Sequence, residues 1–211
     1  MEITAEKIMQ QLSAGTQVAG VIAVFGEEGY YKDKIAAALP RAVFGDAAPE
    51  DREITVFERD TDIKEISAAV NTYPFFSGRS LVIIKDEKLW GGKDGGEKRK
   101  QQQEELAELL ADVPEHCQVL LLGEKIDKRG KLYKSLLKTA AMVECKSLKS
   151  YQLKPWLDEQ AALRGCRFDY EASQTIMEYL SVTDNAPLLL LEQEIEKLSV
   201  YAGERKIWTK D

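Results

Sequence analysis

The chain of 211 residues contains one histidine, three cysteines and no long apolar run, and each scarcity excludes a class of protein. No apolar stretch approaches the roughly 20 residues that span a bilayer, so we expect no membrane partner. The first residues lack the basic region and apolar stretch of a secretory signal. Cys117, Cys145 and Cys166 are odd in number and widely spaced. This argues against a disulfide framework or a zinc site and favours a cytoplasmic protein.

A surplus of basic residues is also missing, since the formal net charge is −7. Sequence-independent binding to nucleic acid depends on lysine and arginine that neutralise phosphates, so an acidic chain is a poor stand-alone DNA binder. Basic residues do gather at residues 98–100 and 125–138. We interpret them as solvated helix faces. A minor contact with DNA that passes through a larger assembly is the alternative.

What the sequence does contain is an alternation of short apolar runs with helical patterns. Apolar runs of strand length occupy residues 21–25, 54–57, 81–84, 119–122 and 142–143. Helical patterns fall at residues 3–12, 31–39, about 62–73 and about 104–111, with a loop beginning at residue 93. Strands that alternate with helices predict an α/β domain with a mostly parallel sheet. We expect Pro40 to end the second helix, and Thr4 to cap the first.

The pattern changes after about residue 146, where we expect the strands to stop. Residues 153–164, 170–180 and 186–202 all have helical periodicity. The sequence therefore predicts an α/β domain over residues 1–146, followed by a small helical domain over residues 147–211.

Two adjacent phenylalanines mark the most informative segment, Tyr-Pro-Phe-Phe-Ser-Gly-Arg at residues 73–79. Proline disfavours helix at the residue before it, so the preceding helix should end at about Tyr73. Phe75 and Phe76 then lie on a short turn before an apolar strand. The rings could fold back as a satellite core, because most aromatic residues are buried. They could instead be displayed to a partner, because exposed aromatic residues are favoured binding anchors.

The order of helix, Tyr-Pro-Phe-Phe-Ser-Gly-Arg and apolar strand resembles the clamp-binding element of the bacterial DNA polymerase III delta subunits, the "wrench" of the clamp loader. Three further segments resemble this family: residues 21–31, with the opening strand and its Gly-Glu turn; residues 119–123, a later core strand; and residues 190–202, with Glu194, Lys197 and Leu198 in a Glu-x-x-Lys-Leu pattern.

This resemblance implies the fold of AAA+ ATPases, a phosphate-binding α/β domain followed by a helical lid. It implies a subunit that binds and opens the sliding clamp (beta) for loading onto primed DNA, with no cofactor. Such a subunit is a non-catalytic part of a DNA polymerase (nucleotidyltransferase) holoenzyme. Its other partners would be the loader subunits gamma/tau and delta prime, reached mainly through a C-terminal collar domain, with primed DNA met only within the complex. Because the family continues beyond the point where this chain stops, we expect the collar to be absent.

The resemblance also implies which residues contact the clamp. Phe75 and Phe76 would insert into the hydrophobic pocket of the clamp, with Phe75 at a place where the family often has leucine. Tyr73 and Pro74 flank the two rings. The preceding helix would lie against a neighbouring clamp surface, and Ile66 and Val70 complete the expected set.

An ATPase has to be considered for such a fold. In a P-loop, a strand leads into Gly-x-x-x-x-Gly-Lys-Ser/Thr, whose backbone amides and lysine hold the phosphates. Here the first strand leads into Gly26, Glu27, Glu28, Gly29 and Tyr30, and no Gly-Lys-Ser/Thr follows. The carboxylates would repel phosphate and the tyrosine would fill the pocket. The sequence therefore predicts a degenerate, non-binding phosphate loop.

Two alternatives remain open at this point. Asp86 and Glu87 end an apolar strand like a Walker B pair, which in a motor holds magnesium and orients water; a degenerate AAA+ ATPase is therefore one rival. A DNA-binding adaptor is the other. The neighbouring His116 and Cys117 could suggest a nucleophile pair, but adjacent residues on an extended backbone point to opposite faces, so we expect a loop histidine.

Overall fold

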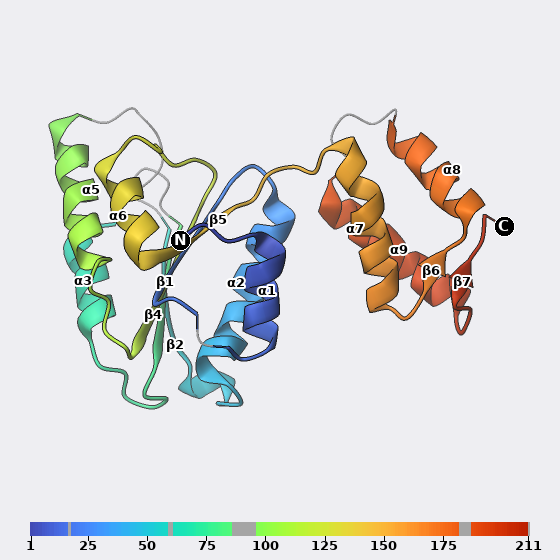
Figure 1. Cartoon of the computed structure of the whole chain (residues 1–211). Coiled ribbons are helices and arrows are strands. Elements are labelled where there is room, and N and C mark those ends of the chain that lie inside the picture. The colour runs from blue at the N-terminus through green and yellow to red at the C-terminus, as the bar shows by residue number, and fades with distance from the viewer. Residues whose placement is uncertain (17, 59–60, 86–95, 182–186, 211) are drawn as a thin grey trace. The chain divides into compact units, whose positions relative to one another are not determined.

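The structure is a computed structural model that describes residues 1–16, 18–58, 61–85, 96–181 and 187–210 (Figure 1). The chain divides into two compact units, Met1–Cys145 and Lys146–Asp211. Within the described residues, no helix combines the length and the apolar character needed to cross a membrane.

The first unit is built on a five-stranded sheet in the order β2-β3-β4-β1-β5, with every pair parallel. The strands are β1 (Val21–Phe25), β2 (Glu53–Phe57), β3 (Ser80–Ile84), β4 (Cys117–Gly123) and β5 (Ala140–Glu144). All residues of β1 and β3 are buried, which fits the continuous apolar runs at residues 21–25 and 81–84. The predicted α/β class with a parallel sheet is confirmed.

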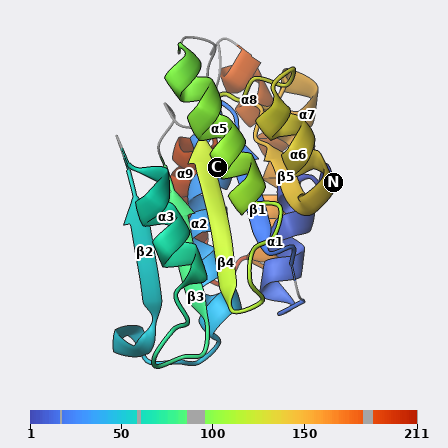
Figure 2. The same cartoon turned by 90° about the vertical axis from the view of Figure 1, so that its left-hand side faces the viewer.

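Helices cover both faces of this sheet (Figures 1 and 2). One face carries α1 (Ala5–Ser13) and α2 (Gly29–Phe44), and the other carries α3 (Ile63–Asn71), α5 (Glu97–Leu109) and α6 (Lys131–Thr139). A 3-10 turn, η1 (Pro49–Asp51), precedes β2. The α3–α5–α6 face packs Ile66, Leu106 and Leu136 on strand residues such as Val82 and Leu121. Each such fully buried aliphatic side chain stabilises the fold by about 1.5–3 kcal/mol.

Thr4 caps α1 as predicted, since its hydroxyl accepts the Lys7 N–H. The end of α2 and the start of α5 differ most from the expectation. Pro40 does not end α2, which continues to Phe44. Proline removes one backbone hydrogen bond, but Leu39, Val43 and Phe44 are buried, and this burial favours the continued helix. In α5, residues 97–103 were expected to belong to a loop and are helical. They follow Gly96 and consist of strong helix formers (Glu, Lys, Arg and Gln).

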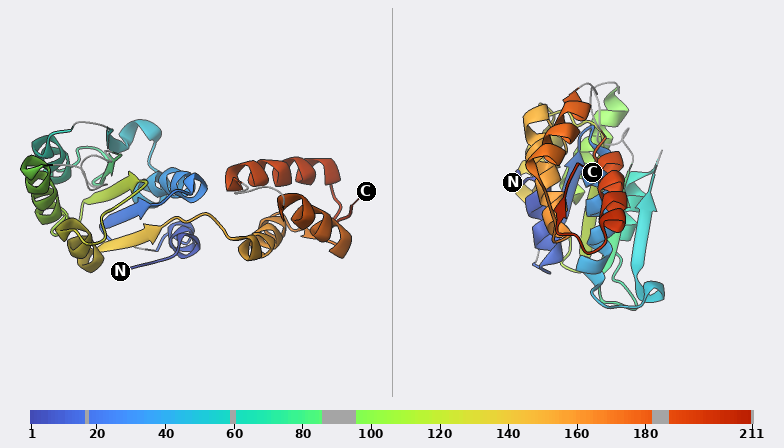
Figure 3. Two further views of the ribbon diagram at one scale, coloured as in Figure 1. Left: turned by 90° about the horizontal axis from the view of Figure 1, so that it is seen from above. Right: turned by 90° about the vertical axis from the view of Figure 1, so that its right-hand side faces the viewer.

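The second unit contains α7 (Ser150–Leu163), α8 (Tyr170–Ser181) and α9 (Leu188–Ala202) (Figure 3). The expectation that strands stop after residue 146 is wrong. Two-residue strands, β6 (Arg167–Phe168) and β7 (Ile207–Trp208), pair in parallel, and the rings of Phe168 and Trp208 pack edge to face at 5.1 Å. Such short strands carry no readable period in the sequence.

Candidate functional site

Residues 73–79, which we call the aromatic turn, connect α3 to β3. The helix ends at Asn71, two residues before the end predicted at about Tyr73, and its C-cap residue Thr72 is extended. Tyr73, Phe75 and Phe76 are 71%, 87% and 69% exposed. Of the two interpretations drawn from the sequence, the satellite core is therefore wrong, because both phenylalanine rings lie in solvent.

The two rings, which we call the ring pair, pack against each other. Their centroids are 5.2 Å apart and their planes are inclined by 74°, an edge-to-face arrangement. Pairs of this kind contribute about 0.5–1.5 kcal/mol beyond the area they bury. The ring pair is thus a local unit that projects from the surface of the first unit.

Several contacts hold the backbone of the aromatic turn. One carboxylate oxygen of Glu53, the first residue of β2, accepts hydrogen bonds from the N–H groups of Phe75 and Phe76, the second at 2.9 Å. The Ser77 hydroxyl donates to the carbonyl of Arg79 at 2.7 Å. Gly78 has φ +66°, a conformation that L side chains rarely adopt. These features fix the course of the chain between α3 and β3.

The structure separates the predicted contact residues into two groups. Tyr73, Phe75 and Phe76 are exposed together, whereas Pro74 is buried and supports the turn. Ile66 and Val70 are fully buried in the core, so the expectation that they contact a partner is wrong. They lie four residues apart on the stripe of α3 that faces the sheet. The exposed residues of α3 are Lys64, Glu65, Ala68 and Asn71.

Glu53 was missed in the sequence. It lies 22 residues before Phe75, and nothing in the local pattern distinguishes it from other surface carboxylates. Only the parallel pairing of β2 with β3, which sets Glu53 opposite Ser80, brings it to the aromatic turn.

The degenerate phosphate loop lies at the other end of the sheet, after β1, and it packs on the end of β5. The Glu28 N–H donates to the Cys145 carbonyl at 3.2 Å. Lys32 Nζ donates to the Gly26 carbonyl at 2.8 Å. Gly26 has φ +133°, and a Cβ there would lie 1.9 Å from the Cys145 carbonyl oxygen. The loop is thus closed onto its own chain.

The start of α2 is occupied by groups of the chain itself. The N-terminus of a helix attracts anions, because its free N–H groups and its dipole favour negative charge. Here the Glu28 carboxylate caps the helix and accepts the Tyr30 N–H at 2.9 Å. Tyr30 and Tyr31 are buried and pack edge to face at 5.1 Å. Asp86 and Glu87, the expected Walker B pair, lie outside the described residues.

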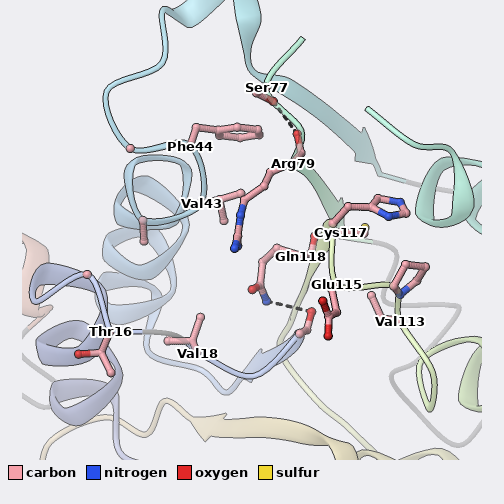
Figure 4. Close-up of a pocket in the computed structure, with 16 residues that line it drawn as sticks. Thr16, Val18, Val43, Phe44, Ser77, Arg79, Val113, Glu115, Cys117 and Gln118 are labelled. Carbon is pink, nitrogen blue, oxygen red and sulfur yellow. Dashed lines mark hydrogen bonds between the residues drawn. The ribbon is translucent and has the colours of Figure 1, made fainter. Parts of the chain in front are cut away.

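A pocket of about 740 Å³ opens at the amino ends of β1, β3 and β4, beside the aromatic turn (Figure 4). Arg79 extends into it, and the Gln118 amide donates to the carbonyls of Ala19 and Gly20 at 2.8 and 2.9 Å. Ligands of open α/β sheets bind outside the carboxyl ends of the strands. This pocket is at the opposite end and does not correspond to a nucleotide site.

His116 and Cys117 line the same pocket without forming a nucleophile pair. His116 lies in a turn, as predicted, and its ring contacts that of Tyr73, with centroids 5.1 Å apart. Burial raises the pKa of the Cys117 thiol, although the Ser80 side chain partly opposes the shift. A raised pKa disfavours the thiolate, which is the nucleophilic form.

Comparison with known proteins gives a consistent result. The chain is 28% identical over 198 residues to DNA polymerase III subunit delta of Bacillus subtilis strain 168, a match that covers 92% of this chain and 56% of the relative. Its structure is similar to that of the Bacillus subtilis DNA clamp loader delta protein, with a TM-score of 0.75, 26% identity, and coverage of 97% of this chain and 60% of the other. The chain thus spans a little over half the length of these relatives.

The family model described as "DNA polymerase III, delta subunit" matches residues 25–146. This segment runs from the end of β1 to the end of the first unit and includes the aromatic turn. The chain therefore belongs to the family of DNA polymerase III delta subunits.

Proposed function

We propose that this chain is the clamp-binding part of a clamp-loader delta subunit, which binds and opens the DNA sliding clamp for loading onto primed DNA in the cytoplasm. The observation that carries the proposal is the exposure of the ring pair, with Phe75 at 87% and Phe76 at 69%. The similar solved structure from Bacillus subtilis is itself named a DNA clamp loader delta protein.

The ring pair has the properties of a binding anchor. Burying each phenylalanine in an apolar pocket stabilises a complex by about 1.5–3 kcal/mol. Aromatic anchors at the centre of an interface carry much of the binding energy, and surrounding polar contacts exclude water. The exposed polar residues of α3, such as Lys64 and Glu65, supply a second and weaker contact surface.

Clamp opening requires no hydrolysis by this chain. A ligand shifts a conformational equilibrium only through its different affinities for the two states. The ring pair and α3 bind the opened edge of the clamp more tightly than the closed edge. Partner subunits that bind ATP (gamma/tau), together with delta prime, control access to the ring pair.

The geometry after β1 disfavours the rival proposal of a degenerate ATPase. The Glu28 carboxylate occupies the position at the start of α2 that a phosphate would need, and the Glu28 N–H is bonded to Cys145. We therefore propose that the subunit is non-catalytic. A DNA-binding adaptor is disfavoured by the net charge of −7.

The test is the affinity of the purified chain for the cognate sliding clamp, measured by calorimetry. The double variant Phe75→Ala with Phe76→Ala is expected to lose at least about 100-fold in affinity, from the area that the rings bury. The control is Tyr151→Ala with Tyr170→Ala, which removes two rings of similar exposure (73% and 75%) from the second unit. Unchanged clamp affinity in the Phe75/Phe76 variant would contradict the proposal.

A further inference from the structure

One carboxylate links the sheet to the ring pair. Oε1 of Glu53 accepts the N–H groups of the two consecutive residues that carry the rings, Phe75 and Phe76. We propose that Glu53 is a positioning residue, which holds the aromatic turn in the conformation that a partner recognises. This inference rests on the proposed function, because the partner is the sliding clamp.

The fold explains why residue 53 can do this. Glu53 begins β2 and lies opposite Ser80, which begins β3. The aromatic turn leads directly into β3, so the amino end of β2 lies beside it. Two successive backbone N–H groups that point to one oxygen form a small anion-binding concavity. Here the anion belongs to the chain itself.

The ring pair has little else to orient it. Both side chains are largely in solvent, and the packing contact described for them is with each other. Hydrogen bonds to an ionised acceptor are stronger than neutral ones, so the carboxylate restricts the backbone at the base of both rings. Ordering a flexible segment on binding lowers affinity, and a segment that is ordered in advance avoids this loss.

Two properties therefore depend on Glu53. In Glu53→Ala, the Phe75 and Phe76 amides lose their acceptor, and we expect their hydrogen exchange to accelerate at least tenfold. The affinity for the clamp should fall about tenfold, from the cost of ordering the turn on binding. The melting temperature should change little, because the turn contributes few buried contacts.

The experiment compares four chains by amide exchange in NMR and by clamp affinity: wild type, Glu53→Ala, Glu53→Gln and Glu50→Ala. Glu53→Gln keeps an acceptor oxygen without the charge. Its amide exchange rates and its clamp affinity should lie between those of the wild type and of Glu53→Ala. Glu50→Ala is the matched control, since it removes an exposed carboxylate from η1, three residues before Glu53. It should leave the hydrogen exchange of the Phe75 and Phe76 amides unchanged, and the clamp affinity as well.

A double-mutant cycle separates positioning from a direct contact. Added to Phe75→Ala with Phe76→Ala, the Glu53→Ala change should cause no further loss of clamp affinity, because there are no rings left to position. An equal loss of clamp affinity in both backgrounds would overturn the inference. Two results for Glu53→Ala alone would also overturn it: unchanged hydrogen exchange of the two amides, or a large drop in melting temperature. Failure of the proposed function would appear differently, as a wild-type chain that does not bind the clamp, while the amide measurement still decides whether Glu53 orders the turn.

Discussion

The carbonyl oxygen of Cys145 occupies the space that a side chain on residue 26 would need. A Cβ built on Gly26 would lie 1.9 Å from that oxygen, and φ at Gly26 is +133°. The loop after β1 and the end of β5 are therefore in contact through their backbones, and the contact tolerates only glycine at this position.

Gly26→Ala is expected to lower the free energy of unfolding by about 3 kcal/mol, from the strained φ and the displaced Cys145 backbone. Gly29→Ala is the control, because a Cβ there meets no atom within 4 Å and φ is not positive. It should be neutral or slightly stabilising, since alanine restricts the unfolded chain. Urea denaturation of both variants measures the difference, and equal stabilities would contradict the loop geometry.

The ring pair and α3 should differ in what they contribute to stability. Phe75→Ala with Phe76→Ala removes exposed rings and should change the free energy of unfolding by less than about 1 kcal/mol. Ile66→Ala empties a fully buried site and should cost about 2–5 kcal/mol. Thermal and urea unfolding measure both. A large loss for the ring-pair variant would place the rings in a core after all.

The occupied start of α2 predicts how the chain responds to nucleotide. A ligand that binds only the folded state stabilises it by RT ln(1 + [L]/Kd), so the melting temperature rises with the ligand concentration. Millimolar Mg-ATP is expected to leave the melting temperature at the value found in salt of equal ionic strength. An increase that grows with the Mg-ATP concentration would revive the motor hypothesis.

Cys145 predicts a loss of stability at alkaline pH. Burial raises the pKa of its thiol to about 12, whereas a thiol in the unfolded chain ionises near its ordinary value of about 8.5. The folded state therefore keeps a proton that the unfolded state loses. The contribution to stability is complete below about pH 8.5 and then falls by up to about 1.4 kcal/mol per pH unit.

The measurement is urea unfolding at pH 8, 9 and 10 for the wild type and for Cys145→Ala. The wild type should lose about 2 kcal/mol more than the variant between pH 8 and pH 10, from the slope of one titrating thiol. Parallel pH profiles for the two chains would show that folding does not raise the pKa of the Cys145 thiol.

The local sequence pattern was sufficient to predict the strands of the first unit. Residues 21–25 were predicted with the bounds of β1, because five apolar residues in a row need burial on both faces. Pro40 misled the prediction of α2, since proline's local cost was outweighed by burial of Leu39 and Phe44 on the sheet. The pair β6 and β7 is too short to leave a periodic signal.

The site was predicted only in part. The exposure of Phe75 and Phe76 was one of two alternatives in the sequence, and the family resemblance favoured it. Ile66 and Val70 were misassigned, because the apolar stripe of α3, the helix that leads to the aromatic turn, faces the protein's own core. Glu53 could not be found from sequence, since its role depends on a contact between residues far apart along the chain.

The exposed ring pair also bears on how the chain behaves in concentrated solution. Two copies that met through these apolar rings would bring together two bodies of the same charge, each −7. Long-range repulsion opposes this at low ionic strength, and added salt shortens its reach to about 10 Å at 0.1 M. Sulfate further strengthens contacts between apolar surfaces. Low-salt buffers should therefore keep the purified chain monodisperse, and sulfate should promote its self-association.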